Sequence, residues 1–243
     1  MANWSDPRMT AVPRAAVGAR EAAFDAGLRS YMLSVYNYMA SAVLLTGIVA
    51  MLFANSAAAP VLLSNGAFRL LLMIAPLGVV MWMSFGINRI SEGTAKALFW
   101  VYAVLMGLSL SSILLVFTGA SVAQAFFATA ASFAALSLFG YTTKKSLSGF
   151  GTFLIMGVFG LMIAMLINMF VHSSAMDLLI SAVGVLLFAG LTAYDTQRIK
   201  SQYFAVRGTA YAGKSAVMGA LTLYLDFINL FLFLLRFMGN QRN

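Results

Sequence analysis

The sequence predicts an all-α integral membrane protein with seven transmembrane helices, and three observations lead to this fold class. The 243 residues are 62% hydrophobic and only 9% charged, whereas about a quarter of the residues in a soluble domain are charged. The uncharged runs are long enough to cross a bilayer, which takes about 20 residues in a helix. The sequence also lacks the alternating segments of about 10 residues that are typical of outer-membrane barrels.

Charged residues divide the chain into a tail and a membrane domain. Residues 1–29 are mixed in charge and contain Pro7, Pro13 and Gly18, so they are expected to form a cytoplasmic tail. Residues 30–240 are expected to form the transmembrane domain, whose first helix serves as its own insertion signal because the tail has no apolar core of a cleavable signal peptide. The predicted helices cover residues 30–54, 67–89, 97–117, 122–141, 151–171, 178–197 and 216–238.

Each predicted helix is bounded by charges or by turn-forming residues. The uncharged run from Arg29 to Arg69 holds the first helix and the turn NSAAAP, and the second helix ends at NRISEG. The uncharged run between Lys96 and Lys144 is about 47 residues long, so it has to be a hairpin of two helices, broken near TGAS at 118–121. The basic loop TKKSLSGFG precedes the fifth helix, and the polar loop KSQYFAVRGTAYAGKS separates the sixth from the seventh.

The basic residues predict that the N-terminus is cytoplasmic. With this orientation, twelve basic residues lie inside, namely Arg8, Arg14, Arg20, Arg29, Arg89, Lys96, Lys144, Lys145, Arg198, Lys200, Arg207 and Lys214. Three lie outside, namely Arg69, Arg236 and Arg242. Such an excess of Lys and Arg in cytoplasmic loops is the usual topology signal, so the net charge of +8 does not indicate a nucleic-acid partner.

Two aspartates lie within the predicted membrane helices. Asp195 lies near the cytoplasmic end of the sixth helix, and Asp226 lies about ten residues into the seventh, which is about 15 Å along its axis. An ionised aspartate at the centre of a membrane helix costs ~2.5–3.5 kcal/mol, so such residues usually face the bundle interior and have a partner. Each acid alone is explained by one structural hydrogen bond or ion pair, whereas two acids at compatible depth on consecutive helices favour a joint site.

A joint site of two carboxyl groups has a defined response to pH. At a separation of ~4 Å and an effective dielectric constant of ~20, two ionised carboxylates repel each other by ~4 kcal/mol. One acid then keeps its proton while the other ionises, and the two titrate together. The shared proton holds the two helices together, and its loss replaces a hydrogen bond with repulsion. The pair is therefore predicted to be a pH switch that acts on helix packing.

Three stretches match motifs of a known family: LYLDFINLFLFLLRF in the last helix, YDTQRI at the end of the previous one, and YAVLMGLSLSSI at 102–113. They resemble the Bax inhibitor-1 family, also called the transmembrane Bax inhibitor motif family, and its bacterial branch above all. The resemblance covers residues 30–238. It implies a multi-pass protein of the bacterial inner membrane whose last helix is central and enclosed by the other six.

The resemblance also implies a function and three site residues. Members of the family are described as pH-dependent calcium leak channels with a hydrogen-bonded pair of aspartates that senses pH, and this role falls on Asp195 and Asp226. A basic residue at the cytoplasmic end of the second helix is thought to latch onto the pair in the closed pore, and by its spacing from Gly107 this residue is Arg89. Arg89 is also explained as an ordinary basic residue of a cytoplasmic loop. Some members carry a further acid within the second helix, which this chain lacks.

Calcium is expected as a permeant ion that binds transiently at Asp195 and Asp226. Calcium prefers six to eight oxygen ligands, and the two carboxylates with Thr196, Gln197 and Asn229 do not complete such a cage. They are instead expected to attract an ion and release it, which suits permeation. Asn229 lies on the helical face of Asp226, where it extends the polar lining or bonds between helices. No cofactor is expected, and the bilayer and calcium ions are the expected partners.

Two other functions stay open. Some bacterial members of the family are linked to a membrane-bound ATP-dependent protease as slow substrates or modulators, and the 29-residue tail is long enough to be gripped by one. An intramembrane aspartyl protease also uses two aspartates on neighbouring helices, but it carries Gly-x-Gly-Asp where this chain has LYLD. An enzyme is therefore not expected. Gly184 and Gly190 are expected to allow close contact between helices.

Overall fold

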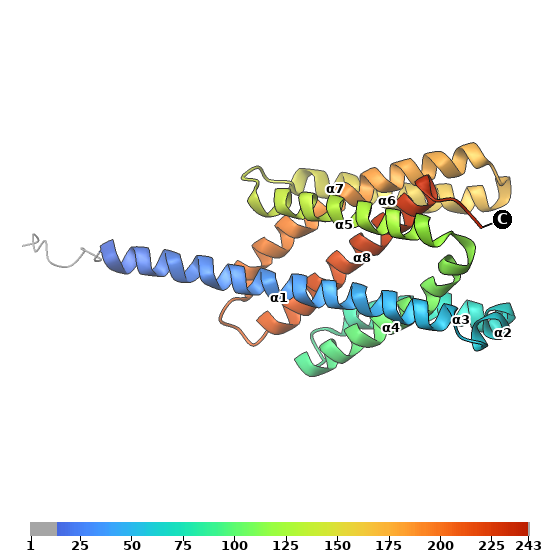
Figure 1. The fold of residues 1–243 in the computed structure, drawn as a ribbon. Helices are drawn as coiled ribbons and strands as arrows, with labels where there is room; N and C mark the ends of the chain where they lie inside the picture. The colour runs from blue at the N-terminus through green and yellow to red at the C-terminus, as the bar shows by residue number, and fades with distance from the viewer. Residues whose placement is uncertain (1–13, 243) are drawn as a thin grey trace, which may run out of the picture.

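The structure is a computed structural model that describes the backbone of residues 14–242 and the side chains of residues 26–242. This part of the chain folds into eight α-helices, shown in Figure 1: α1 (Arg14–Ala54), α2 (Ala58–Ser64), α3 (Gly66–Gly86), α4 (Glu92–Val116), α5 (Gly119–Thr142), α6 (Ser148–Val171), α7 (Ser174–Val206) and α8 (Ala212–Met238). All except the short α2 are long and apolar enough to cross a membrane, which gives the seven predicted spans.

Polar side chains fix the starts of several helices. The first N–H groups of a helix have no partner within it, and Ser, Thr and Asn side chains can accept their hydrogen bonds. Ser91 accepts from the N–H of Thr94 at the start of α4, and Thr118 accepts from the N–H of Ser121 at the start of α5. Asn65 does the same for α3. These caps end the connecting turns and let each apolar segment start as a helix.

The last helix, α8, forms the centre of the bundle, as predicted. Two thirds of its apolar window (67%) is buried inside the protein, compared with 11–33% in the other six spans. It packs mainly against α7, α1, α5 and α4, while α3 packs behind α4 and α6 packs behind α7. The lipid-facing helices can therefore expose apolar side chains, whereas almost every position in the middle of α8 faces protein.

A buried hydrogen-bond network joins α8 to α1 and α4. The Thr46 hydroxyl donates to the carbonyl of Ala103 over 2.9 Å, and it lies 2.7 Å from the hydroxyl of Tyr224. Because a threonine hydroxyl has one hydrogen, Tyr224 must be the donor in the second bond. Tyr224 is fully buried, so the network holds three helices in one register.

Glycines bring the helices close together where the sequence analysis expects it. A Cβ atom on Gly184 would lie 2.5 Å from the ring of Phe233 on α8, and one on Gly190 would lie 2.8 Å from the side chain of Leu154 on α6. Real Cβ atoms do not approach other atoms so closely, so α7 depends on these glycines for its contact with both neighbours. The prediction for both residues is confirmed.

Two helices are longer than predicted. α1 begins at Arg14 rather than at residue 30, so it extends into the predicted tail, and Figure 1 shows it continuing beyond the bundle at its N-terminal end. The rest of that tail, residues 1–13, lies outside the described residues. α7 continues to Val206, so the predicted polar loop is mostly helix and only residues 207–211 connect α7 to α8. The segment KSQYFAV has no glycine or proline to break the helix, and the chain turns only near Gly208, whose φ is 73°.

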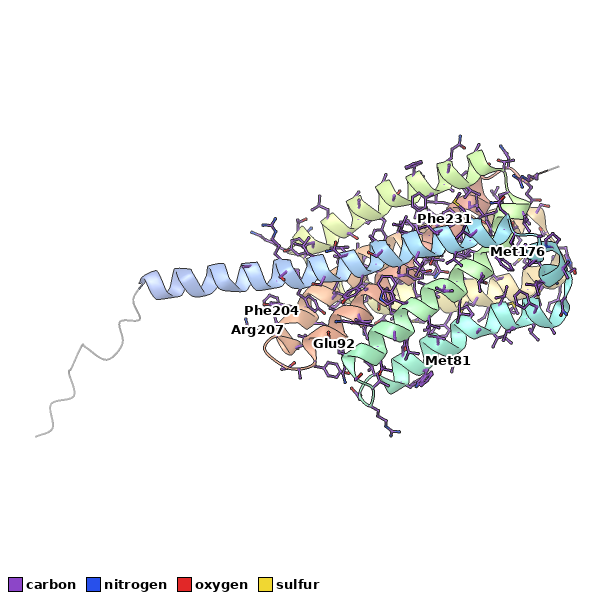
Figure 2. All side chains as sticks on the ribbon, turned by 60° about the horizontal axis from the view of Figure 1, so that its bottom comes forward. Met81, Glu92, Met176, Phe204, Arg207 and Phe231 are labelled. Atoms are coloured by element: carbon purple, nitrogen blue, oxygen red, sulfur yellow. The ribbon has the colours of Figure 1, made fainter. Side chains whose placement is uncertain are left out.

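Most basic side chains of the described residues lie at one end of the bundle, here called the basic end. This end carries the α3–α4, α5–α6 and α7–α8 connections, and Figure 2 shows Glu92, Phe204 and Arg207 there. Its basic residues are Arg29, Arg89, Lys96, Lys144, Lys145, Arg198, Lys200, Arg207 and Lys214, whereas the opposite end has Arg69, Arg236 and Arg242.

Candidate functional site

The structure brings the two predicted aspartates together in the interior of the bundle. Asp195 lies on α7 and Asp226 on α8, with exposed fractions of 7% and 4%. Their carboxyl groups lie within hydrogen-bonding reach of each other. Asp195 lies 11 residues before the end of α7 and Asp226 lies 14 residues after the start of α8. These spacings correspond to about 16 Å and about 21 Å of helix. The prediction that Asp195 lies near the end of its helix is therefore wrong, because α7 continues for 11 residues past it.

One oxygen of the pair has no hydrogen-bond donor. Asp226 Oδ2 is buried, and none of the N–H or O–H groups of the described residues donates to it. A buried acceptor without a partner is costly, and more so if it carries a charge. A proton held between the two carboxyl groups would supply the missing hydrogen.

Arg198 is the charged neighbour of the pair, and the sequence analysis did not assign it to the site. Its Nη1 lies 3.8 Å from Asp195 Oδ1, three residues earlier on α7. The side chain of Arg198 is 56% exposed and that of Asp195 is 9% exposed, so the ion pair connects a buried acid to the basic end of the bundle. The spacing of three residues between an acid and a base on one helix is a signal that could have identified this contact.

Thr196 connects α7 to α5. Its hydroxyl donates to Ser137 Oγ over 3.4 Å, and the hydroxyl of Tyr36 on α1 interacts with both of these side chains. The backbones are close here too, because a Cβ on Gly140 would collide with the backbone of Ala193. Thr196 thus stabilises the packing of α5 and α1 around the segment of α7 that carries Asp195.

Gln197 faces the α5–α6 connection. Its Oε1 accepts from the N–H of Leu147 over 2.7 Å, and its Nε2 donates to the carbonyl of Lys145 over 2.9 Å. Both ends of the amide are therefore used to hold a loop at the basic end. This position gives Gln197 a structural role, because its amide holds the loop against α7.

Asn229 and Arg89 lie on opposite sides of the pair. The Asn229 amide donates to the carbonyl of Leu225 in its own helix over 2.8 Å, and Asn229 also lines a cavity of about 320 Å³ that lies toward the other end of the bundle and includes Arg236. Arg89 lies just past α3, and its side chain is exposed. The latch proposed for Arg89 is not formed in this conformation, in which Arg198 is the base that contacts Asp195.

The charged part of the site consists of two carboxyl groups and one arginine. Among residues 26–242, no group of three or more His, Cys, Asp or Glu side chains could hold a metal ion. The two carboxyl groups are also not part of the cavity lined by Asn229. This arrangement can hold or lose a proton at the contact between α7 and α8. The nearby cation of Arg198 favours the ionised form of Asp195.

Comparisons with known proteins agree with the fold and with the motifs. The sequence model of the family described as "Inhibitor of apoptosis-promoting Bax1" matches residues 28–243. The "Inner membrane protein YbhL" of Escherichia coli (strain K12) is 48% identical over 220 residues, which are 89% of this chain and 94% of the relative. A protein of Rickettsia prowazekii is 47% identical over 90% of this chain and 93% of its own length. One of Caulobacter vibrioides is 44% identical over 90% of this chain and 91% of its own length. The chain is therefore a multi-pass inner-membrane protein that belongs to the Bax inhibitor-1 family.

Proposed function

We propose that this protein is a pH-sensitive calcium leak channel in the inner membrane, gated by the pair of Asp195 and Asp226. The observation that carries the proposal is the contact between two buried carboxyl groups at the interface of α7 with the central helix α8. Two acids in such a place hold their helices together only while they share a proton. The same groups are the strongest attraction for a cation within the bundle.

The direction of the pH response follows from the charge of the pair. With one proton shared, the carboxyl groups bond to each other and α7 stays against α8. When that proton is lost, two like charges face each other, and their repulsion of ~4 kcal/mol at ~4 Å exceeds the ~0.6–1.7 kcal/mol of a typical hydrogen bond between membrane helices. The flux of calcium should therefore rise as the pH rises.

The path that we propose leads from the cavity lined by Asn229 to the basic end of the bundle. Asn229 lies three residues after Asp226, which is about one turn of helix, so the cavity of about 320 Å³ ends close to the pair. We place the basic end in the cytoplasm because cytoplasmic loops carry the excess of Lys and Arg. With so few oxygen ligands, calcium would bind briefly at the pair and leave again.

The decisive experiment measures calcium flux into proteoliposomes between about pH 5 and about pH 8. The wild type is compared with Asp195→Asn and Asp226→Asn. In each variant an amide replaces one carboxyl group, and its N–H groups can donate a hydrogen bond at every pH. Both variants should lose the rise of flux with pH. Asp177→Asn is a matched control, because Asp177 is an exposed acid in the first turn of the same helix, α7.

Two outcomes would contradict this function. A protein without calcium flux at any pH would not be a leak, and a pH profile that is unchanged in both variants would separate the leak from the pair. A further result would point to the aspartyl protease instead: cleavage of transmembrane peptides by the purified protein that Asp226→Asn abolishes.

The alternative function as a substrate or regulator of a membrane-bound ATP-dependent protease has one structural observation in its favour. α1 extends beyond the bundle at its N-terminal end (Figure 1), so a partner can reach this part of the chain without disturbing the core. Under this alternative the aspartate pair would serve the stability of the bundle.

A further inference from the structure

An open groove lies between α1 and α5 at the side of the bundle. Both helices pack against α7 and α8, and Figures 1 and 2 show them running next to each other. The groove encloses about 590 Å³. Its lining comes from one face of each helix and consists of Arg29, Met32, Leu33, Tyr36, Met39 and Ala40 on α1 and Phe133, Ala134, Ser137, Leu138 and Tyr141 on α5.

The groove has the length of one leaflet of a bilayer. Its α1 side runs from Arg29 to Ala40, a spacing of 11 residues and therefore about 16 Å of helix. The hydrocarbon core of a bilayer is about 30 Å thick, so one leaflet contributes about 15 Å. Small side chains, Ala40 and Ala134, face the groove in its deeper half, so a chain of methylene groups has room between the helices.

The basic residues that line or border the groove all lie at its mouth. Arg29 is exposed at the basic end. On the α5 side, Lys200 Nζ donates to the carbonyl of Tyr141 over 2.7 Å and lies 4.9 Å from the centre of the Tyr141 ring. Lys144 lies three residues after Tyr141 and is exposed. The mouth therefore combines basic groups with aromatic rings at the level where lipid headgroups lie.

We propose that this groove binds one anionic phospholipid, with an acyl chain between α1 and α5 and the phosphate group at Arg29. The apolar lining matches the chain, and the basic groups at the mouth match a headgroup with a net negative charge. Basic pockets between transmembrane helices bind such headgroups in other membrane proteins. The inference rests on the groove alone and does not depend on the proposed calcium leak.

A lipid in this position would lie against the residues that surround the aspartate pair. Tyr36 and Ser137 line the groove, and both interact with Thr196, the residue that follows Asp195. The acyl chain would cover these hydroxyl groups from the side and keep water away from α7. The bound lipid is thus a part of the wall around the site.

The test measures lipid binding to the purified, delipidated protein by native mass spectrometry. Phosphatidylglycerol is titrated against phosphatidylcholine with the same acyl chains, and we expect one phosphatidylglycerol to bind in preference. Ala134→Leu fills the groove and should abolish the bound lipid. Arg29→Gln should weaken binding of phosphatidylglycerol about fivefold, the factor that corresponds to ~1 kcal/mol for one basic residue at a membrane surface.

Two matched variants control for general effects on the protein. Ala135 is exposed on the same helix but does not line the groove, and Arg69 is exposed at the opposite end of the bundle. Ala135→Leu and Arg69→Gln should therefore bind the lipid like the wild type. Because Ala134 is exposed, Ala134→Leu leaves the core intact, and an unchanged thermal unfolding curve verifies this.

Four results would overturn the inference. The first is equal binding of phosphatidylcholine and phosphatidylglycerol, and the second is unchanged lipid binding in Ala134→Leu. The third is a dimer of the chain, lost in Ala134→Leu, because a second copy would then occupy the groove. The fourth is displacement of phosphatidylglycerol by an equal concentration of inorganic phosphate, because the acyl chain would then contribute nothing.

Discussion

Replacing Arg198 by glutamine tests the coupling between the aspartate pair and the basic end of the bundle. The change removes the positive charge that lies 3.8 Å from Asp195 Oδ1. A nearby cation favours the ionised form of a carboxyl group, so the pair should keep its shared proton up to a higher pH in Arg198→Gln. Because the proposed leak opens when that proton is lost, the midpoint of calcium flux against pH should move upward.

The size of this change depends on how well water screens the ion pair. At 3.8 Å and an effective dielectric constant of ~20, the Coulomb energy is about 4.4 kcal/mol, equivalent to about 3 pH units. However, the Arg198 side chain is 56% exposed, and ion pairs of exposed side chains contribute only ~0.2–1 kcal/mol. The screened value applies here, so the midpoint should rise by about 0.1 to 0.7 pH unit.

The assay is calcium flux into proteoliposomes over a fine series of pH values, with Lys144→Gln as the control. Lys144 is exposed at the same end of the bundle, so its removal changes the surface charge equally without touching Asp195. Arg198→Lys, which keeps the charge, should retain most of the wild-type midpoint. A midpoint in Arg198→Gln that falls, or that matches Lys144→Gln, would refute the role of Arg198. A rise of more than about two units would refute the screening argument.

Two further predictions concern the core and the N-terminal part of the chain. Tyr224→Phe removes the donor of the buried bond to Thr46 and should lower the free energy of unfolding by ~0.6–1.7 kcal/mol. This is measured by unfolding in mixed micelles against Tyr211→Phe, whose bond to Asn88 is exposed; equal losses in both variants would contradict it. Deleting residues 1–25 should leave calcium flux intact, because the cavity and the aspartate pair lie elsewhere. Loss of flux in the truncated protein would contradict this prediction. Slower degradation of the truncated protein in cells, together with no flux in the full-length protein, would favour the protease alternative.

The sequence was sufficient for those features that depend on composition and on spacing along one helix. Long uncharged runs predicted seven spans. Asp195 and Asp226 were predicted to form a joint site because acids within membrane helices usually face the bundle interior and have a partner. The length of α7 was missed for a physical reason: polarity marks where a helix leaves the membrane but not where it ends. Residues 200–202 (Lys-Ser-Gln) are polar, and the helix still continues to Val206.

Other features of the site depend on contacts between distant segments. In the sequence analysis, Gln197 was counted among the polar groups near the two carboxylates. In the structure its amide bonds to the backbone groups of Lys145 and Leu147, about 50 residues earlier. No local pattern indicates that a loop will fold over this amide. Arg198 differs, since its spacing from Asp195 was visible in the sequence and only its importance was overlooked.

The short connection between α7 and α8 makes these two helices a lever with its pivot at the basic end. Only residues 207–211 join them, so they cannot separate freely there. Asp226 lies about 21 Å from the start of α8, and Met238, at the far end, lies about 39 Å from it. A rigid tilt that moves the aspartates apart by a given distance would therefore move the far ends apart by nearly twice that distance. A small repulsion at the pair would thus be amplified at the cavity beside Arg236, on the opposite face of the membrane.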